Sequence, residues 1–209
     1  ALAEAERLAA AGRALAAQEG PLDTIVADGG SDDGVPAAGA AADGARVIRA
    51  PRGRAAQMNA GAREARGGIL WFLHADCLPP PGAAAAIRSL LARSPEALGA
   101  FRFALEGRRV AYRLVEAGAR IRSERFRLPY GDQGLFCRAE AFRAMGGFPE
   151  RPMEDLFLVR AWRRRGRPVT VLPIPLPTSA RKWERDGVVR TTLRHARMMM
   201  RGLAGAPVT

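Results

Sequence analysis

The chain has 209 residues, and its 33 Lys and Arg against 21 Asp and Glu give a formal net charge of +12. This length fits one α/β domain with at most a small appendage. No uninterrupted apolar stretch reaches about 18 residues, which excludes a transmembrane helix, and the opening residues, with Glu4 and Glu6, are unlike a signal peptide. Cys77 and Cys137 form neither a zinc motif nor a disulfide framework, so a reduced, cytoplasmic setting is expected.

The strong positive charge suggests an acidic partner such as nucleic acid, anionic lipid or a phosphorylated substrate, although an arginine-rich composition explains it equally well. Only 6% of the residues are aromatic, so few side chains are available to stack on the bases of a single strand. The sequence contains no helix-turn-helix or zinc-finger pattern. We therefore do not expect nucleic acid as a partner.

The first half of the chain alternates between helices and short apolar strands. Helices are predicted over Ala3–Gln18, over Arg54–Arg66 and after Pro79–Pro81. Strands are predicted over Thr24–Ala27, Ala45–Ile48 and Ile69–Leu73. This alternation predicts a single Rossmann-like α/β domain with a mostly parallel sheet flanked by helices. Polar clusters follow the strands, where ligands bind in open α/β sheets.

The second half is less regular, and no linker in it is long enough to mark a domain boundary. Strands are predicted over Gly99–Leu105, Leu135–Cys137 and Val169–Leu172. Helices are predicted over Arg108–Arg127, Ala139–Met145, Glu154–Arg165 and Val188–Leu203. A sheet of this kind usually begins with a strand, whereas this chain begins with a helix, so we expect the first strand to precede Ala1.

Two clusters in the first half suit a nucleotide. In Asp28–Gly34, glycines allow close approach of the backbone and carboxylates accept hydrogen bonds from a base or ribose, although composition alone favours an ordinary turn. In Arg49–Gly61, arginines at a helix start combine their charge with the helix N-terminus, which suits a diphosphate. A solvated basic turn explains the second cluster equally well.

Three further clusters carry acidic residues. Asp76 of His74-Ala75-Asp76 follows a strand, where one carboxylate anchors Mg²⁺ or Mn²⁺ if a diphosphate supplies other oxygens. We favour metal binding for Asp76 and a structural role for His74, and keep both as candidate ligands. Glu154-Asp155 opens a helix, where acidic residues also suit the helix dipole. Gly131-Asp132-Gln133 is a turn by composition.

The order of these clusters resembles the family 2 glycosyltransferases, which have the GT-A fold. The resemblance runs from Ala1 to about Trp183, followed by a basic amphipathic helix and tail over residues 184–209. Four motifs carry it: Ile25–Gly34 (IVADGGSDDG), Gly53–Gly61 (GRAAQMNAG), Leu70–Asp76 (LWFLHAD), and Gly146–Phe148 (GGF) with Glu154-Asp155. The chain looks closest to a bacterial subgroup with His-Ala-Asp in place of Asp-x-Asp, some members of which are linked to arsenosugar biosynthesis.

The resemblance implies a role for each motif. Asp155 would be the catalytic base with Glu154 beside it, and Asp76, with His74 as a second candidate, would bind the metal. The remaining residues would bind the donor: Asp28, Gly30, Ser31, Arg49, Arg54, Asn59, Ala75, Asp76, Gly131, Asp132, Gln133, Arg181 and Trp183. The last two lie in Arg181-Lys182-Trp183, which looks like a shortened form of an Arg-Trp element that some processive members place over the diphosphate.

The implied reaction is an inverting transfer from a UDP- or GDP-linked sugar to an acceptor hydroxyl, dependent on Mn²⁺ or Mg²⁺. Asp155 would remove the acceptor proton, and Asp76-bound metal with Arg54 would stabilise the leaving diphosphate. Two alternatives stay open: a nucleotidyltransferase on a similar sheet, and a basic polyanion-binding module without enzymatic activity. The acceptor is unidentified, and many relatives act on lipid-linked acceptors.

The last helix, Val188–Leu203, has a basic face and an apolar face. Its arginines Arg190, Arg194, Arg197 and Arg201 share one face, and Val189, Leu193, Ala196, Met200 and Leu203 fall on another. Such a helix suits the inner surface of an anionic membrane, so peripheral contact there is one interpretation. We favour the other, in which the apolar face packs on the protein and the basic face is solvated.

Overall fold

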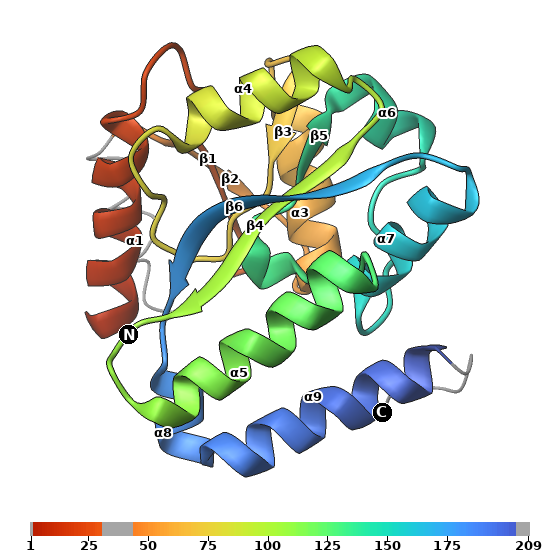
Figure 1. The fold of residues 1–209 in the computed structure, drawn as a ribbon. Helices are drawn as coiled ribbons and strands as arrows, with labels where there is room; N and C mark the ends of the chain where they lie inside the picture. Colours follow the sequence, from red (N-terminus) through yellow and green to blue (C-terminus); the bar gives the residue numbers. More distant parts are fainter. Residues whose placement is uncertain (1, 31–43, 204–209) are drawn as a thin grey trace.

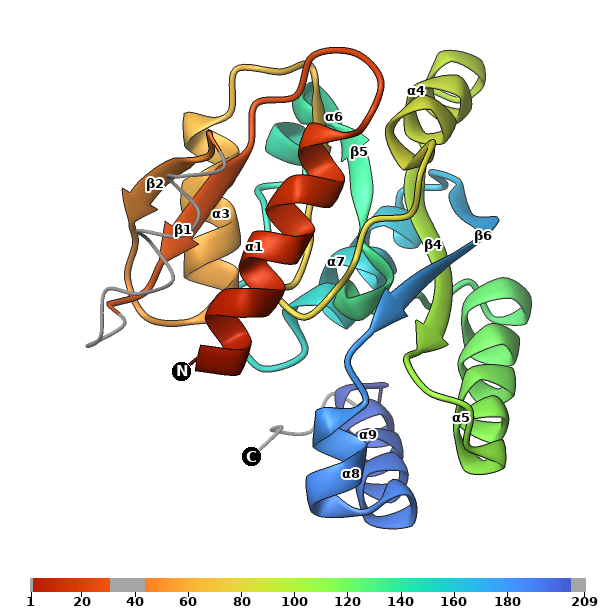
Figure 2. The ribbon, with the colours of Figure 1, turned by 90° about the vertical axis from the view of Figure 1, so that its left-hand side faces the viewer.

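The computed structural model describes residues 2–30 and 44–203. In Figure 1 the strands lie in the middle of the molecule, α1 and α4 lie along two of its sides, and α5 and α9 lie next to each other below the strands. Figure 2, turned by 90°, shows α5 on the side away from β1, β2 and α3, and α8 and α9 below the strands. The predicted α/β class is confirmed.

The first half follows the predicted order closely. Helix α1 begins at the start of the described chain, and the segments after it alternate between strand and helix. The elements are α1 (Leu2–Ala16), β1 (Ile25–Asp28), β2 (Arg46–Arg49), α3 (Arg54–Glu64), β3 (Ile69–Trp71) and α4 (Ala83–Arg93). Their boundaries lie within a few residues of those expected, because apolar periodicity and the Gly67-Gly68 break are local signals.

The second half contains the remaining strands and the helices that surround them. The elements are β4 (Leu98–Leu105), α5 (Val110–Arg120), the π-helical turn η1 (Ile121–Arg125), the 3₁₀ turn η2 (Gly131–Gln133), β5 (Phe136–Arg138), α6 (Ala139–Ala144), α7 (Glu154–Arg164), β6 (Val169–Thr178), α8 (Arg181–Asp186) and α9 (Val188–Leu203). The single helix expected over Arg108–Arg127 is thus α5 followed by η1.

The strands form two sheets, and the larger one is mixed. Strands β1 and β2 pair in parallel, and the four-stranded sheet has the order β3-β5-β4-β6. In it β4 and β6 are parallel, whereas β5 runs antiparallel to both β3 and β4. The sheet is therefore mixed, whereas the alternation of strands and helices predicted a mostly parallel one. Strand β5 is antiparallel because the chain enters it from η2 and not through a crossover helix.

Strand β6 is longer than the sequence predicted. It continues past Leu172, the expected end of the strand, through three prolines to Thr178. Proline is tolerated here because β6 is the edge strand of its sheet. A register shift at Phe101/Arg102 accommodates the change in pairing. The extension matters for the site, because the backbone N–H of Leu78 donates to Pro177 and that of Ser179 donates to Asp76.

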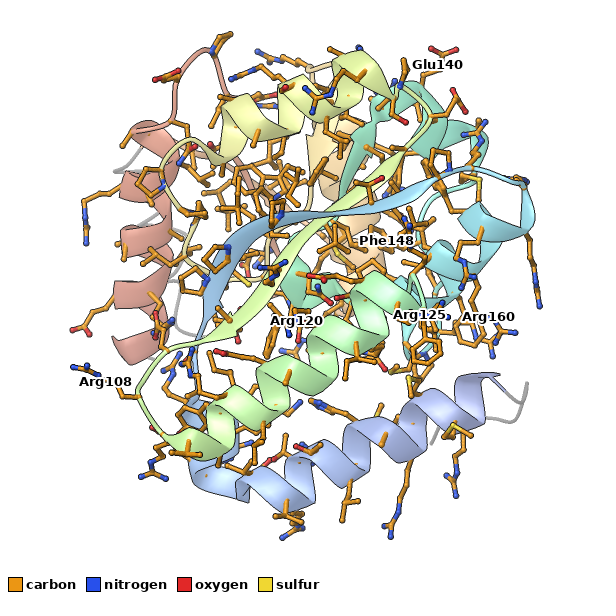
Figure 3. All side chains as sticks on the ribbon, in the orientation of Figure 1. Arg108, Arg120, Arg125, Glu140, Phe148 and Arg160 are labelled. Carbon is orange, nitrogen blue, oxygen red and sulfur yellow. The ribbon has the colours of Figure 1, made fainter. Side chains whose placement is uncertain are left out.

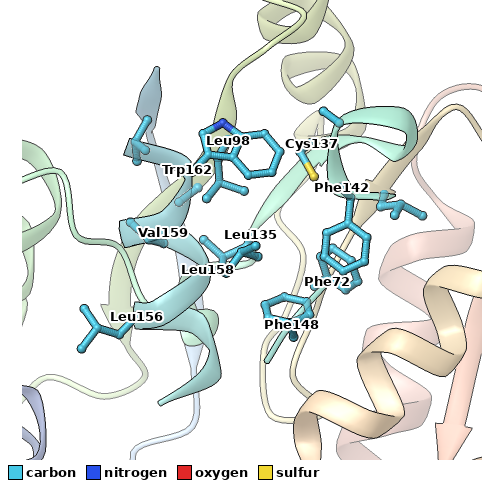
Figure 4. Close-up of a cluster of buried hydrophobic side chains, with 14 of the residues drawn as sticks. Phe72, Leu98, Leu135, Cys137, Phe142, Phe148, Leu156, Leu158, Val159 and Trp162 are labelled. Carbon is cyan, nitrogen blue, oxygen red and sulfur yellow. The ribbon is translucent and has the colours of Figure 1, made fainter. Parts of the chain in front are cut away.

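A buried apolar core joins the sheet to α6 and α7. Charged side chains lie outside it, such as Arg108 and Arg125 next to the two ends of α5 in Figure 3. Figure 4 shows the core: Phe72, Phe142 and Phe148 form one group, and Trp162 packs near Leu98 in another. The three phenylalanine rings contact one another with centroids 4.9–5.3 Å apart. This packing holds the start of α7 against the strands.

The expectation that α9 packs through Val189, Leu193 and Met200 is wrong. These side chains are exposed, and the helix packs through another stripe, in which Thr191 is fully buried and Met198 and Met199 reach the core. The tight turn at Gly187 and the edge contact between the Trp183 and His195 rings, 5.8 Å apart, fix this rotation of the helix. The described residues include no helix that is both long and apolar enough to cross a membrane.

Gly99→Ala should destabilise the sheet where β4 and β5 meet. A Cβ atom at this position would lie 2.1 Å from two carbons of the buried Phe136 ring, whereas Gly99 itself has no positive φ. We expect a loss of about 1–3 kcal/mol in the free energy of unfolding from overpacking, measured by urea denaturation. Gly61→Ala is the control, because the space around Gly61 in α3 is open and alanine favours a helix. Equal stability of the two variants would contradict this packing.

Candidate active site

The carboxylate of Asp155 joins two segments of the chain at the first turn of α7. Its Oδ2 accepts a hydrogen bond of 2.7 Å from the backbone N–H of Gly131, and its Oδ1 accepts one of 2.7 Å from the N–H of Leu156. Asp155 is 7% exposed. A helix N-terminus carries free N–H groups and favours negative charge. The side chain is therefore held in one orientation against η2.

His74 approaches the same point from the other side. A Cβ atom on Gly131 would lie 2.8 Å from His74 Nε2 and 3.4 Å from Asp155 Oδ2. His74 Nε2 is buried and has no hydrogen-bond partner among the described residues. The absence of a side chain at Gly131 thus brings an imidazole nitrogen and a carboxylate oxygen to one place. The sequence favours a structural role for His74, but Nε2 makes no hydrogen bond that would serve such a role among the described residues.

Asp132 belongs to the same group of side chains. Burial raises the pKa of its carboxyl, electrostatic interactions with Arg122 and His74 lower it, and the charges of Asp155 and Asp76 raise it. Its Oδ1 is buried without a hydrogen-bond partner in the described part of the chain. The loop after β3, η2 and the start of α7 therefore bring His74, Asp76, Asp132 and Asp155 close enough to interact.

The turn that carries Asp76 is held from two sides. Its backbone carbonyl accepts a hydrogen bond of 3.1 Å from Ser179 N and another of 3.1 Å from the Arg7 guanidinium. Arg7 also forms an ion pair of 2.8 Å with Glu106. Helix α1 and the end of β6 thus fix this loop, while the Asp76 side chain is half-buried and Ala75 is exposed.

Positive side chains face the acidic group. Arg54 forms an ion pair of 2.9 Å with Glu154, whose side chain is 5% exposed against 60% for Arg54. The guanidinium of Arg122 stacks 3.3 Å from the centre of the Tyr130 ring, and burial lowers its pKa. Arg54, which is largely exposed, and Arg122, which is largely buried, therefore both approach the site.

The α8–α9 pair adds Lys182 and His195. Their Nζ and Nε2 atoms lie 2.9 Å apart. Burial, together with the positive charges of Lys182, Arg194, Arg122 and Arg54, lowers the pKa of His195 to about 4. His195 is therefore neutral at physiological pH and accepts a hydrogen bond from the ammonium group of Lys182. The influence of Arg54 and Arg122 shows that α9 approaches the same site.

Sequence reasoning missed Arg122, Tyr130 and His195 as site residues, and gave Lys182 no role. The only available signal was scarcity. The chain has two histidines, and Lys182 is its single lysine among 33 basic residues. Both histidines lie at this site.

Several predicted donor residues have structural partners. Asn59 donates to the Phe148 carbonyl at 2.8 Å and accepts from Phe148 N at 2.9 Å. Gln133 is fully buried and donates to the Phe101 carbonyl at 2.8 Å. Trp183 is buried against Phe103. These contacts hold the loops in position. That the three residues also bind the donor stays a prediction.

The predicted nucleoside loop lies at the end of the two-stranded sheet. Asp28 pairs in register with Arg49, and its Oδ1 accepts a hydrogen bond of 3.2 Å from Gly30 N. Ser31 lies outside the described residues. Arg181 Nε donates to Ser179 Oγ at 3.3 Å, next to the Asp76 turn. The structure thus brings together the residues after β3, in η2 and in α7, whereas Asp28 and Arg49 form a separate group.

Comparisons with known proteins place the fold. No curated protein matches the chain. Among solved structures, it is similar to the mannosyltransferase PcManGT from Pyrobaculum calidifontis in complex with GDP-Man and Mn²⁺, with a TM-score of 0.63 and 23% identity over 83% of this chain and 53% of that one. It is also similar to a mycobacterial protein, with a TM-score of 0.56 and 20% identity over 84% of this chain and 61% of that one.

These two structures share the fold of the chain, which spans between half and two thirds of their length. The sequence profile described as glycosyl transferase family 2 matches residues 1–146. That match includes the His-Ala-Asp turn, η2 and all strands up to β5. The chain belongs to glycosyl transferase family 2.

Proposed function

We propose that the chain transfers a sugar from a nucleotide-sugar donor to an acceptor hydroxyl, with inversion at the anomeric carbon. The observation that carries this proposal is the Asp155 carboxylate, which two backbone N–H groups hold beside His74 and Asp132. A single oriented carboxylate suits one displacement, in which it takes the proton of the attacking hydroxyl. Membership of a glycosyltransferase family supports the same chemistry.

In this mechanism the acceptor oxygen attacks the anomeric carbon while Asp155 accepts its proton. The bond to the nucleoside diphosphate breaks, and the leaving group gains negative charge. Arg54 and the positively charged groups Arg122 and Lys182 face this site and would stabilise that charge. Glu154 would hold Arg54 through their 2.9 Å ion pair. Asp28 would contact the nucleoside, with Gly30, Arg49 and the adjacent loop.

A metal ion fits the site only together with its substrate. The described residues contain no group of three His, Cys, Asp or Glu side chains that could hold an ion. Asp76 and the unpartnered Nε2 of His74 would supply two ligands, and diphosphate oxygens and water would complete the shell, as is usual for Mg²⁺. Such an ion, when bound, supplies charge neutralisation at the diphosphate. Mn²⁺ and Mg²⁺ are both candidates.

The donor is proposed to be a GDP- or UDP-linked sugar. One of the two structural neighbours is a mannosyltransferase in complex with GDP-Man and Mn²⁺, which supports a guanine nucleotide and manganese. The subgroup with His-Ala-Asp, and its link to arsenosugars, rests on the sequence motif alone. A nucleotidyltransferase or a polyanion-binding module has no support from the family match.

Ligand-dependent stability tests the donor proposal. We expect one nucleotide class, among UDP-, GDP-, dTDP- and CMP-sugars, to raise the melting temperature only when Mn²⁺ or Mg²⁺ is present. Binding to the folded state alone adds about 2.7 kcal/mol of stability at a ligand concentration one hundred times Kd. Asp76→Asn should remove the metal-dependent part of this shift. A protein that responds to none of these pairs would contradict the proposal.

Asp155→Asn should lower transfer by roughly 10²–10⁴-fold while the donor-induced thermal shift persists. The amide cannot accept a proton as a carboxylate does, and its NH₂ group would face a backbone N–H, so the melting temperature of the free variant is measured as well. Asp23→Asn is the matched control, because its carboxylate forms an ion pair with Arg46 that belongs to the β1–β2 sheet. Near-normal turnover of Asp155→Asn would exclude it as the base.

Gly131→Ala tests the close approach of His74. Gly131 has no positive φ, so alanine fits its backbone conformation, and the His74 ring, whose Nε2 and Cε1 would lie 2.8 and 3.2 Å from the new Cβ, must give way. We expect turnover to fall by at least about tenfold, because a small displacement of reacting groups costs this much or more. Turnover and the metal-dependent thermal shift are measured together. Wild-type values for both would show that the position of His74 is unimportant.

A further inference from the structure

Large apolar side chains are exposed mainly on one part of the molecule. Of the eight such side chains that are exposed among the described residues, only Leu22 lies away from α5, η1 and α9. Phe126 directly follows η1. The other six lie on α5, at the start of η1 or on α9: Val110, Leu114, Ile121, Val189, Leu193 and Met200. We call these six residues the α5/α9 stripes. Val110, Leu114 and Val189 are each more than 70% exposed.

The two stripes have the same spacing. On each helix the second residue is four positions, and the third eleven positions, after the first. This spacing places the three side chains on one face of a helix. Helices α5 and α9 contact each other and run side by side in the same direction in Figure 1. Each of these two neighbouring, parallel helices therefore exposes one apolar row along its length.

Arginines flank both rows. Helix α9 contains no Asp or Glu, and Arg190, Arg197 and Arg201 are exposed on it. On the α5 side Arg120 and Arg125 are exposed, and Figure 3 labels both. Two copies of the chain that met through this face would bring these arginines together. The charge therefore favours an anionic partner over a second copy.

We propose that the α5/α9 stripes dock on the surface of an anionic lipid bilayer. The apolar rows would enter the boundary between headgroups and acyl chains, and the flanking arginines would contact acidic headgroups. The 16 residues of α9 extend about 24 Å along the surface. Exposed apolar rows that follow two helix axes suit a lipid interface better than a peptide, which needs a groove. This inference goes beyond the proposed transfer reaction and involves none of its residues.

Co-sedimentation with vesicles tests the proposal in the absence of donor and acceptor. We expect the full chain to bind phosphatidylcholine vesicles that contain phosphatidylglycerol and to bind vesicles of phosphatidylcholine alone much more weakly. The variant Leu114→Gln/Leu193→Gln/Met200→Gln keeps every charge and should lower the partition coefficient at least about tenfold. All three positions are exposed, so the fold is expected to persist, and circular dichroism checks this.

A matched pair of charge variants tests the role of the arginines. Arg190→Gln/Arg197→Gln should weaken binding to the anionic vesicles several-fold. Arg63→Gln/Arg143→Gln changes the net charge equally at exposed positions on α3 and α6 and should retain most of the binding. Equal effects of the two variants, or wild-type binding by the triple glutamine variant, would overturn the proposal. A dimer in sedimentation velocity that the triple variant dissolves would overturn it in favour of a second copy.

Discussion

The site depends on the hydrogen bond between the Gly131 N–H and the Asp155 carboxylate. This contact of 2.7 Å joins residues that are 24 positions apart and ties the first turn of α7 to η2. Because both partners are buried, loss of either would leave an unsatisfied polar group, which costs about 1–3 kcal/mol. His74, Asp132 and the Asp76 turn are all arranged around this junction. Its position is in turn set by the phenylalanine core that supports α7.

The opposing charges at the site come from different layers of the fold. The acidic side chains follow β3, lie in η2 or begin α7, whereas the basic groups come from α3, η1, α8 and α9. Desolvation lowers the pKa of the Arg122 guanidinium and of the Lys182 ammonium group, both of which stay charged, whereas His195 is neutral. Cations that are desolvated in the absence of an anion gain most when one binds, because the effective dielectric constant around them is low. This arrangement favours a multiply charged leaving group such as a nucleoside diphosphate.

The sequence was informative wherever the signal was local. The order of strands and helices, the His-Ala-Asp turn and the acidic start of α7 could all be predicted, because each rests on a short run of residues. The contribution of Arg122 could not, since it depends on how η1 packs against η2. The prolines after Leu172 hid most of β6, because only its edge position makes them tolerable. Asn59 and Gln133 were assigned to the donor by motif, yet both bind backbone groups of the protein.

Helix α9 shows why an amphipathic pattern alone does not determine which face is buried. Its sequence contains two stripes with apolar residues. The pattern predicts that the stripe with more of them, which includes Leu193 and Met200, packs on the protein. The buried stripe is instead the one with Thr191, His195 and Met198, because His195 meets Trp183 and Lys182 of α8. The inner face of α9 thereby contributes to the site, and the outer face is left with Leu193 and Met200. The same helix therefore carries a residue of the site on one face and exposed apolar side chains on the other, so a partner bound at the outer face would contact the element that holds His195 beside Lys182.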